Sequence, residues 1–194
     1  MKYNFKTEHL SEKVFLVIKG YGFMYDPDFT PNINPNEDTW GIIQQQLLNG
    51  TVECLKKNAG SDIVYMLLCN TCVRNDDKKR YDVSYDIACE YLNDSETADG
   101  FEIVRLKPCE YAVFDCDFDG GYTLSGAHEK PDDIFWGEWL KANPYTCEID
   151  NPANWLGNGY ASIEQYSPFN PNTEKFSAKI WYPIKRKNEE NPAV

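Results

Sequence analysis

The same order of segments occurs twice along the chain, and this repetition limits the possible folds more than any single motif does. Each copy reads as strand, helix, strand, strand, and the second copy lies about 100 residues after the first. The matched segments are 3–20 with 101–120, 40–55 with the helix that contains Trp136, 63–69 with 161–166, and 81–87 with 176–184. Because the match is one of pattern rather than identity, we predict a tandem duplication of one supersecondary unit.

Hydrophobic periodicity identifies the individual segments. Residues 81–87 alternate strictly between apolar and polar side chains, which is the period of a strand with one buried face. Residues 40–55 instead place apolar side chains at a period near 3.6, which predicts a helix, although Gly50 lies inside it and predicts a break. Pro131 predicts the start of the second helix, and Asn143 followed by Pro144 predicts its end.

One helix cannot cover both faces of a three-stranded sheet, so the two units must share a core. Two units joined around a pseudo-twofold axis predict an α+β fold, with a curved antiparallel sheet, helices on one side and a central ligand cleft. We therefore predict a single domain over residues 1–194. Repeat one covers about 1–92, repeat two covers about 100–187, and a tail covers 188–194.

The charge of the chain restricts its partners. Its 31 Asp and Glu residues against 19 Lys and Arg residues give a formal net charge of −12 at pH 7. This charge repels phosphate backbones and argues against nucleic acid as a partner, while it favours a cationic one. No apolar run approaches the roughly 18–20 residues of a membrane span, and no signal-peptide core is present. We therefore predict no membrane partner, a cytoplasmic location, and reduced thiols for the seven cysteines.

Five segments, in this order and spacing, resemble the GyrI-like small-molecule-binding family. That family includes the effector-binding domains of AraC- and MerR-type regulators and also standalone forms. The segments are 80–83 (Arg-Tyr-Asp-Val), 108–114 (Pro-Cys-Glu-Tyr-Ala-Val-Phe), 135–140 (Phe-Trp-Gly-Glu-Trp-Leu), 163–166 (Ile-Glu-Gln-Tyr) and 180–185 (Ile-Trp-Tyr-Pro-Ile-Lys). The resemblance spans essentially the whole chain, and because no helix-turn-helix precedes the first repeat, we expect a standalone form.

The resemblance implies a pocket between the repeats that holds one buried carboxylate, and the acid at that position is Glu164. Strand alternation places Glu164 on the same face as Ser162 and Tyr166. A buried carboxylate without a nearby Lys or Arg is costly unless a ligand's positive charge or a raised pKa compensates it. The alternative interpretation is an ordinary solvent-facing strand residue.

The resemblance also implies aromatic pocket walls, which would attract a cation through the faces of their rings. The candidates are Tyr111, Trp136, Tyr166 and Trp181. For Trp181 the neighbours Ile180 and Tyr182 could take the inward face instead. The segments 26–35 and 146–158 depart from the simplest family pattern, and they could lie over the mouth of the pocket.

Three other motifs do not support a cofactor, a metal or covalent catalysis. The Cys69–Cys72 pair lacks the two further ligands of a zinc site. Residues 115–120 resemble the first half of a calcium loop, but position twelve is Gly126 instead of Glu, so we predict an acidic turn. The two histidines, His9 and His128, lie in polar segments away from a candidate nucleophile. We therefore predict no cofactor and no metal.

The leading hypothesis is a standalone cytoplasmic protein that binds small aromatic or cationic molecules, with drug or toxin sequestration as its role. The resemblance leaves two alternatives open. One is a hydrolase of cyclopropane-containing genotoxins, in which a buried Glu would activate water or protonate a leaving group. The other is a gyrase-inhibitor-like module, whose charge of −12 would compete with DNA for a basic protein surface. The sequence therefore leaves open whether the protein is an enzyme.

Overall fold

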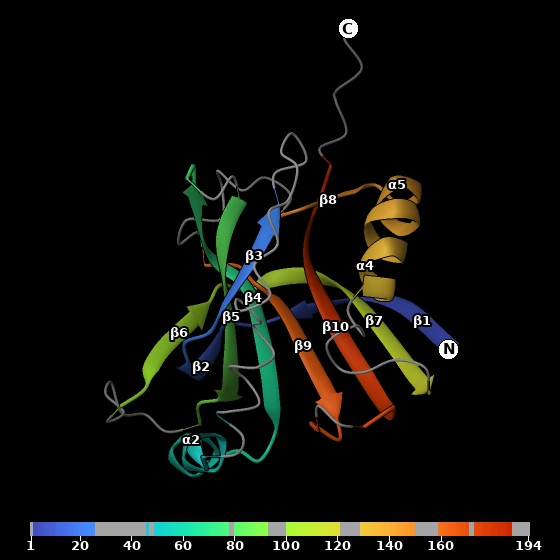
Figure 1. Ribbon diagram of the computed structural model, residues 1–194. Helices are drawn as coiled ribbons and strands as arrows, with labels where there is room; N and C mark the ends of the chain where they lie inside the picture. Colours follow the sequence, from blue (N-terminus) through green and yellow to red (C-terminus); the bar gives the residue numbers. More distant parts are fainter. Residues whose placement is uncertain are drawn as a thin grey trace, which may run out of the picture.

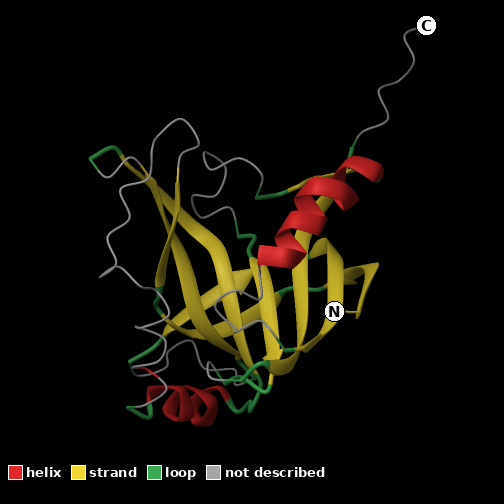
Figure 2. Ribbon diagram, turned by 45° about the vertical axis from the view of Figure 1, so that its right-hand side comes forward, coloured by secondary structure: helices red, strands yellow, loops and turns green. Residues whose placement is uncertain are grey.

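The computed structural model describes residues 2–25, 46, 49–77, 80–92, 100–120, 129–149, 159–170 and 173–187, without the side chains of 21–25, 69–74, 80–83 and 129. Within these residues, ten strands form one antiparallel sheet that twists and curves (Figures 1 and 2). The strands are β1 (Lys2–Leu10), β2 (Lys13–Ile18), β3 (Tyr21–Tyr25), β4 (Val64–Asn75), β5 (Arg80–Glu90), β6 (Glu102–Leu106), β7 (Cys109–Asp119), β8 (Tyr145–Cys147), β9 (Ser162–Ser167) and β10 (Lys175–Arg186). The predicted α+β class is confirmed.

The two halves of the sheet have equivalent strand orders when each is followed from its own edge to the centre. It runs β1-β7-β10-β9-β4-β5-β2-β6, with β3 added beside β5 and β8 beside β10. Strands β7, β10 and β9 on one side therefore correspond to β2, β5 and β4 on the other. Each edge strand pairs with a strand of the other set. Strand β1, which precedes β2 in the chain, pairs with β7, and β6, which precedes β7, pairs with β2. This order is the one expected of two interlocked units, while their common origin stays a prediction.

Two helical segments pack against the sheet. Helix α2 (Thr51–Ala59) buries Val52, Leu55 and Ala59 and contacts β2 and β5. The second segment consists of α4 (Glu129–Ile134), the π-helix η1 (Phe135–Trp139) and α5 (Leu140–Ala142). Both contribute buried side chains to the same core, although they lie at different ends of the sheet (Figure 1).

Glycine and proline positions explain where the helices begin and end. Gly50, at φ 78°, is left-handed and precedes α2, so the predicted break at this glycine is confirmed and the helix starts at Thr51. The other predicted residues of that helix, 40–45, 47 and 48, lie outside the described residues. At the end of α5, Asn143 is extended, as its position before Pro144 predicts.

Strand alternation separates the buried side chains into two cores. The first lies on the helix-bearing face and includes Met66, Tyr85, Phe114, Ile180 and Tyr182. The second lies on the opposite face and is formed by sheet residues, together with residues that flank the strands. Its members are Phe15, Val17, Leu67, Ala88, Leu106, Cys109, Tyr111, Val113, Ala161, Ile163 and Trp181. Two successive residues of a strand therefore belong to different environments, which matters for the site below.

The predicted acidic turn at 115–120 is wrong in part. Residues 115–119 continue strand β7, and the chain leaves the strand only at Gly120. Asp115 and Asp117 are exposed, while Cys116 and Phe118 between them are buried in the first core. The acidic residues thus occupy the solvent side of a strand, because every second side chain in a strand faces the same way.

Several other predicted features can be placed. The Cys69–Cys72 segment lies in β4, where the register with β5 shifts between Leu68 and Cys72. Of the segment 146–158, Thr146 and Cys147 belong to β8 and pair with β10, so its start is a strand rather than a loop. Residues 26–35, His128 and the tail 188–194 lie outside the described residues. Among the residues that the structure describes, no helix is long and apolar enough to cross a membrane.

Candidate ligand-binding site

Glu164 lies at the middle of the sheet, on β9. Its register partners are Ile180 on β10 and Met66 on β4, and both belong to the core on the helix-bearing face. Because directly opposed residues of neighbouring strands point to the same face, Glu164 points into that core. Only 2% of the residue is exposed. The alternative interpretation of Glu164 as a solvent-facing strand residue is therefore wrong.

Two tyrosine hydroxyls hold the Glu164 carboxylate. Tyr85 and Tyr166 each donate a hydrogen bond to Glu164 Oε2 at 2.8 Å. Tyr166 lies two residues along the same strand, whereas Tyr85 reaches across β4 from β5. Burial raises the pKa of each tyrosine well above its usual value of 10, and the adjacent Glu164 charge raises it further. Both hydroxyls therefore remain protonated hydrogen-bond donors at any physiological pH.

The carboxyl of Glu164 titrates near neutrality. Burial raises its pKa from 4.5 to about 7, although the hydrogen bonds from Tyr166 and Tyr85 favour the charged form and lower the pKa in part. Among the described residues, no Lys, Arg or His forms an ion pair with Glu164. A positive charge is thus the interaction that this carboxylate lacks within the described part of the protein.

A second carboxyl–tyrosine pair lies on the same face. The Tyr182 hydroxyl donates a hydrogen bond of 2.7 Å to Asp132 Oδ1, which α4 supplies. Tyr182 is two residues along β10 from Ile180, the register partner of Glu164. The Phe135 ring stacks on the Tyr182 ring at a centroid distance of 4.0 Å and an interplanar angle of 6°. The start of the helical segment is therefore fixed to the centre of the sheet.

Sequence reasoning misses three of these side chains. Tyr85 stands in a strictly alternating strand, which indicates only a core residue, and Tyr182 enters only as an alternative to Trp181. Asp132 follows Pro131 in the first turn of the predicted helix, where acidic residues are common. The contacts of these side chains span 79 and 50 residues of sequence, which no local pattern encodes.

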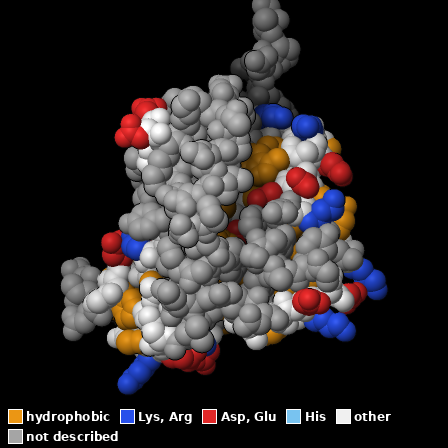
Figure 3. All heavy atoms as spheres, in the orientation of Figure 1, with side chains coloured by type: hydrophobic (Ala, Val, Ile, Leu, Met, Phe, Trp, Pro, Cys, Tyr) orange, Lys and Arg blue, Asp and Glu red, His pale blue; other side chains and the backbone are white. Residues whose placement is uncertain are grey.

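Trp136 and Tyr166 lie on the Glu164 face. Tyr166 contacts the carboxylate directly. Trp136 is half-buried on η1 and meets Phe135 edge to face, with centroids 4.9 Å apart. On the face seen in Figure 3, acidic and hydrophobic side chains lie beside each other near the α4–η1–α5 segment.

Tyr111 and Trp181 lie on the opposite face from Glu164. Trp181 is paired with Ile163 and Val113, and all three belong to the second core. Its indole Nε1 donates a hydrogen bond of 2.8 Å to Glu8, the register partner of Tyr111. The five predicted residues therefore do not form one wall. Ile180 and Tyr182 take the inward face in place of Trp181, because alternation assigns neighbours of a strand to opposite sides.

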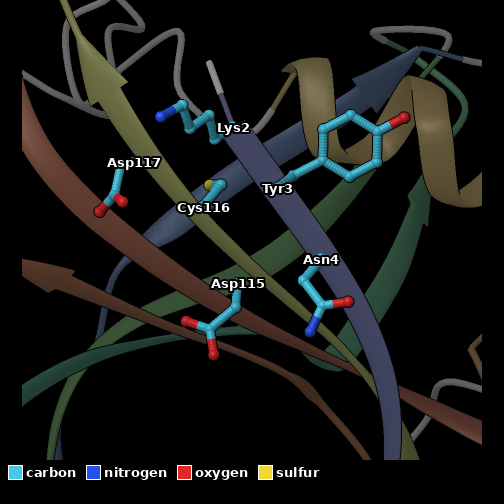
Figure 4. Close-up of a pocket in the computed structure, with 6 residues that line it drawn as sticks. All are labelled: Lys2, Tyr3, Asn4, Asp115, Cys116 and Asp117. Atoms are coloured by element: carbon cyan, nitrogen blue, oxygen red, sulfur yellow. The ribbon is translucent and has the colours of Figure 1, made fainter.

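A surface pocket lies elsewhere, where the start of β1 meets the end of β7. It is lined by Lys2, Tyr3, Asn4, Asp115, Cys116 and Asp117. In Figure 4 the carboxylates of Asp115 and Asp117 point to one side of the strand pair, while the Tyr3 ring points to the other. None of the five predicted site residues lines this pocket, so it is a separate feature of the sheet edge.

No protein-family model and no curated protein sequence matches the chain. Solved structures do match it. SAV2435 bound to tetraphenylphosphonium superposes with a TM-score of 0.60 at 18% identity, over 95% of this chain and 94% of that one. A putative transcription regulation protein from Staphylococcus aureus MU50 gives 0.55 at 18% identity, over 95% and 99%. The EcmrR C-terminal domain gives 0.50 at 14% identity, over 96% and 99%.

The chain has the fold of these proteins. The α+β architecture with a large antiparallel sheet is thereby confirmed, with nearly full coverage of both chains in each of these three comparisons, while the tandem duplication and the cleft stay predictions. In a complex of EcmrR with DNA, the matching part is 58% of the EcmrR chain, at a TM-score of 0.52 and 10% identity.

The buried carboxyl predicts how the stability of the protein depends on pH. The pKa of Glu164 is about 7 in the folded protein and 4.5 in the unfolded chain. Between pH 4.5 and pH 7 the folded protein therefore keeps a proton on Glu164 that the unfolded chain has lost. The protonation of Glu164 therefore makes the free energy of unfolding fall by about 3 kcal/mol as the pH rises from 4.5 to 7. Above pH 7 this contribution of Glu164 no longer changes with pH. Denaturant unfolding at pH 5 and pH 8 should show this difference between wild type and Glu164→Gln. Equal pH dependence in both proteins would contradict it.

Proposed function

We propose that the protein binds small aromatic or cationic molecules on the helix-bearing face of the sheet, with Glu164 as the acidic anchor. The main observation behind this proposal is the buried carboxylate of Glu164, which accepts two hydrogen bonds from tyrosines and forms no ion pair with the described residues. Tetraphenylphosphonium, the molecule bound to SAV2435, is an aromatic cation, which supports the same chemistry on this fold. Sequestration of a drug or toxin is the corresponding role.

The chemistry of the site favours a lipophilic cation over other ligands. Transfer of an isolated charge to an apolar environment is costly, and an opposite charge on the ligand would compensate that cost for Glu164. Aromatic rings add attraction for a cation of about 0.5–2 kcal/mol per good contact. Tyr166 and Trp136 are the predicted wall residues that lie on this face, and Tyr85 and Tyr182 join them as further aromatic candidates. The proposed pocket lies between the two repeats, where β9 meets β4.

Tetraphenylphosphonium is a suitable first probe, because its charge does not titrate. The ionised form of Glu164 is about a tenth of the population at pH 6 and about nine tenths at pH 8, given its pKa of about 7. We therefore expect the apparent Kd to fall about tenfold from pH 6 to pH 8. Isothermal titration calorimetry in buffers of different ionisation enthalpy should also detect a released proton near pH 6. Absence of tetraphenylphosphonium binding at both pH 6 and pH 8 would contradict the proposed function.

Hydrolysis is the second candidate function, and one observation favours it. A carboxyl with a pKa of about 7 is matched to proton transfer at neutral pH, and Glu164 has this pKa. In that role the acid would protonate a leaving group or activate water in a strained substrate. Incubation with a cyclopropane-containing genotoxin followed by mass spectrometry separates the two functions. An unchanged mass supports the binding protein, and a gain of one water supports the hydrolase.

A further inference from the structure

A second acid accepts a hydrogen bond from a tyrosine on the same face as Glu164. Asp132 accepts the hydrogen bond from Tyr182, and Tyr182 stands on the same face of the sheet as Glu164. One strand spacing of about 4.8 Å and two residues of rise place the Cα atoms of Glu164 and Tyr182 about 8 Å apart. The two carboxyl groups are therefore each bound by tyrosine side chains of one core, on a single face of the sheet.

The charges of the two acids act on the same groups. Burial raises the pKa of Tyr182, as it does that of Tyr85, and the charge of Asp132 raises both pKa values further. Glu164 in turn raises the pKa of Tyr182. Negative charge is thus concentrated over Tyr85, Tyr182 and the strands between them, in surroundings where charges are screened less than at the surface.

The two acids differ in depth. Glu164 is 2% exposed and lies in the middle of the sheet, whereas Asp132 on α4 is partly exposed. The Tyr182 side chain spans the distance between these two levels, since it rises from the sheet and ends at Asp132. The arrangement offers one carboxyl group deep in the core and one nearer the surface, on the same face of the sheet.

We propose that Asp132 is a second acidic anchor of this site, and that the site therefore prefers a compact aromatic dication to a monocation of the same shape. This inference rests on the proposed function, because it assigns a second charge to the same ligand. Glu164 binds the deeper positive end of the dication, and Asp132 binds the outer one. Tyr182 positions Asp132, and Phe135 holds Tyr182 through ring stacking.

Two ligands of nearly equal size test this preference. Methyl viologen is a flat biaryl with a positive charge on each ring, and 1-methyl-4-phenylpyridinium has the same shape with one charge. At pH 8 and low salt we expect wild type to bind methyl viologen at least tenfold more tightly. Asp132→Asn should remove this preference, weakening methyl viologen about tenfold and 1-methyl-4-phenylpyridinium less than threefold. Asp133→Asn, an exposed neighbour on α4, is the matched control and should change neither.

The possible outcomes separate the two proposals. If wild type binds neither ligand nor tetraphenylphosphonium, the proposed function itself fails. If wild type binds both probes equally, or if Asp132→Asn weakens both equally, the binding site stands and the second anchor is overturned. Asp132→Glu keeps the charge and should retain the preference, which distinguishes loss of charge from a structural defect. Should Asp132→Asn not fold, Asp132→Ser takes its place in the same comparison, because the net charge of −12 alone would also give wild type a salt-dependent preference for the dication.

Discussion

Glu164→Gln is expected to weaken tetraphenylphosphonium binding at pH 8 by about 30-fold or more. Truncating one partner of a buried charge pair costs about 2–5 kcal/mol, and the variant removes the charge while it keeps the size of the side chain. The amide oxygen of Gln can still accept hydrogen bonds from Tyr85 and Tyr166, so the fold should survive. Calorimetric titration of wild type and variant at pH 8 measures the loss.

Glu174→Gln is the matched control for this substitution. Glu174 lies just before β10, it is exposed, and its replacement changes the net charge by the same amount. We expect an affinity within about twofold of wild type, because exposed charges contribute little. If both variants bind as wild type does, Glu164 is not the anchor. If both lose affinity equally, the effect belongs to the overall charge of the protein rather than to the site.

Gly20→Ala is expected to destabilise the protein by about 3–5 kcal/mol. A Cβ atom at Gly20 would lie 2.0 Å from the backbone oxygen of Tyr85, and a backbone atom cannot move aside as a flexible side chain can. The same glycine accepts a hydrogen bond from the Tyr85 amide and donates one to buried Asp86. Its displacement would leave these groups short of partners, which adds to the cost. Urea unfolding at pH 7 measures the change.

Gly137→Ala supplies the matched control for the clash. A Cβ atom at Gly137, in the π-helix η1, would meet nothing within 4 Å. Because Ala is favoured over Gly in helices, we expect no loss of stability and a gain of up to about 1 kcal/mol. A loss at Gly137 as large as that at Gly20 would show that the method reports the glycine exchange rather than the contact with Tyr85.

The sequence predicts the strands well because their apolar periods are local. Residues 81–87 and 176–184 lie within β5 and β10, and 161–166 agrees with β9 to within one residue. The start and end signals at Gly50 and Asn143 are equally local and are also confirmed. The predicted acidic turn at 115–120 is wrong except at Gly120, because the pattern Asp-Cys-Asp-Phe-Asp has the period of a strand as well as the composition of a loop.

The candidate site can be predicted only in part. The family resemblance directs attention to Glu164, and alternation then places Tyr166 beside it. The same alternation separates Trp181 from Tyr182, but the sequence does not say which of the two faces the helices. That choice depends on Tyr182 meeting Phe135 and Asp132, which are about 50 residues away in sequence. Side-chain partners joined only by the tertiary fold cannot be read from periodicity.

The crossed edge strands determine when during synthesis the sheet can be completed. Among the described strands β1 is made before the others, yet its partner β7 appears only when residues 109–119 have left the ribosome. The central strand β9 lies between β4 and β10, and β10 is made after the other described strands. Such long-range pairing is slow to form, and it leaves the early strands unpaired on the nascent chain. The carboxylate centre therefore assembles only after β10 has been made, so a chain interrupted before β10 would lack the strand that pairs with β9 beside Glu164.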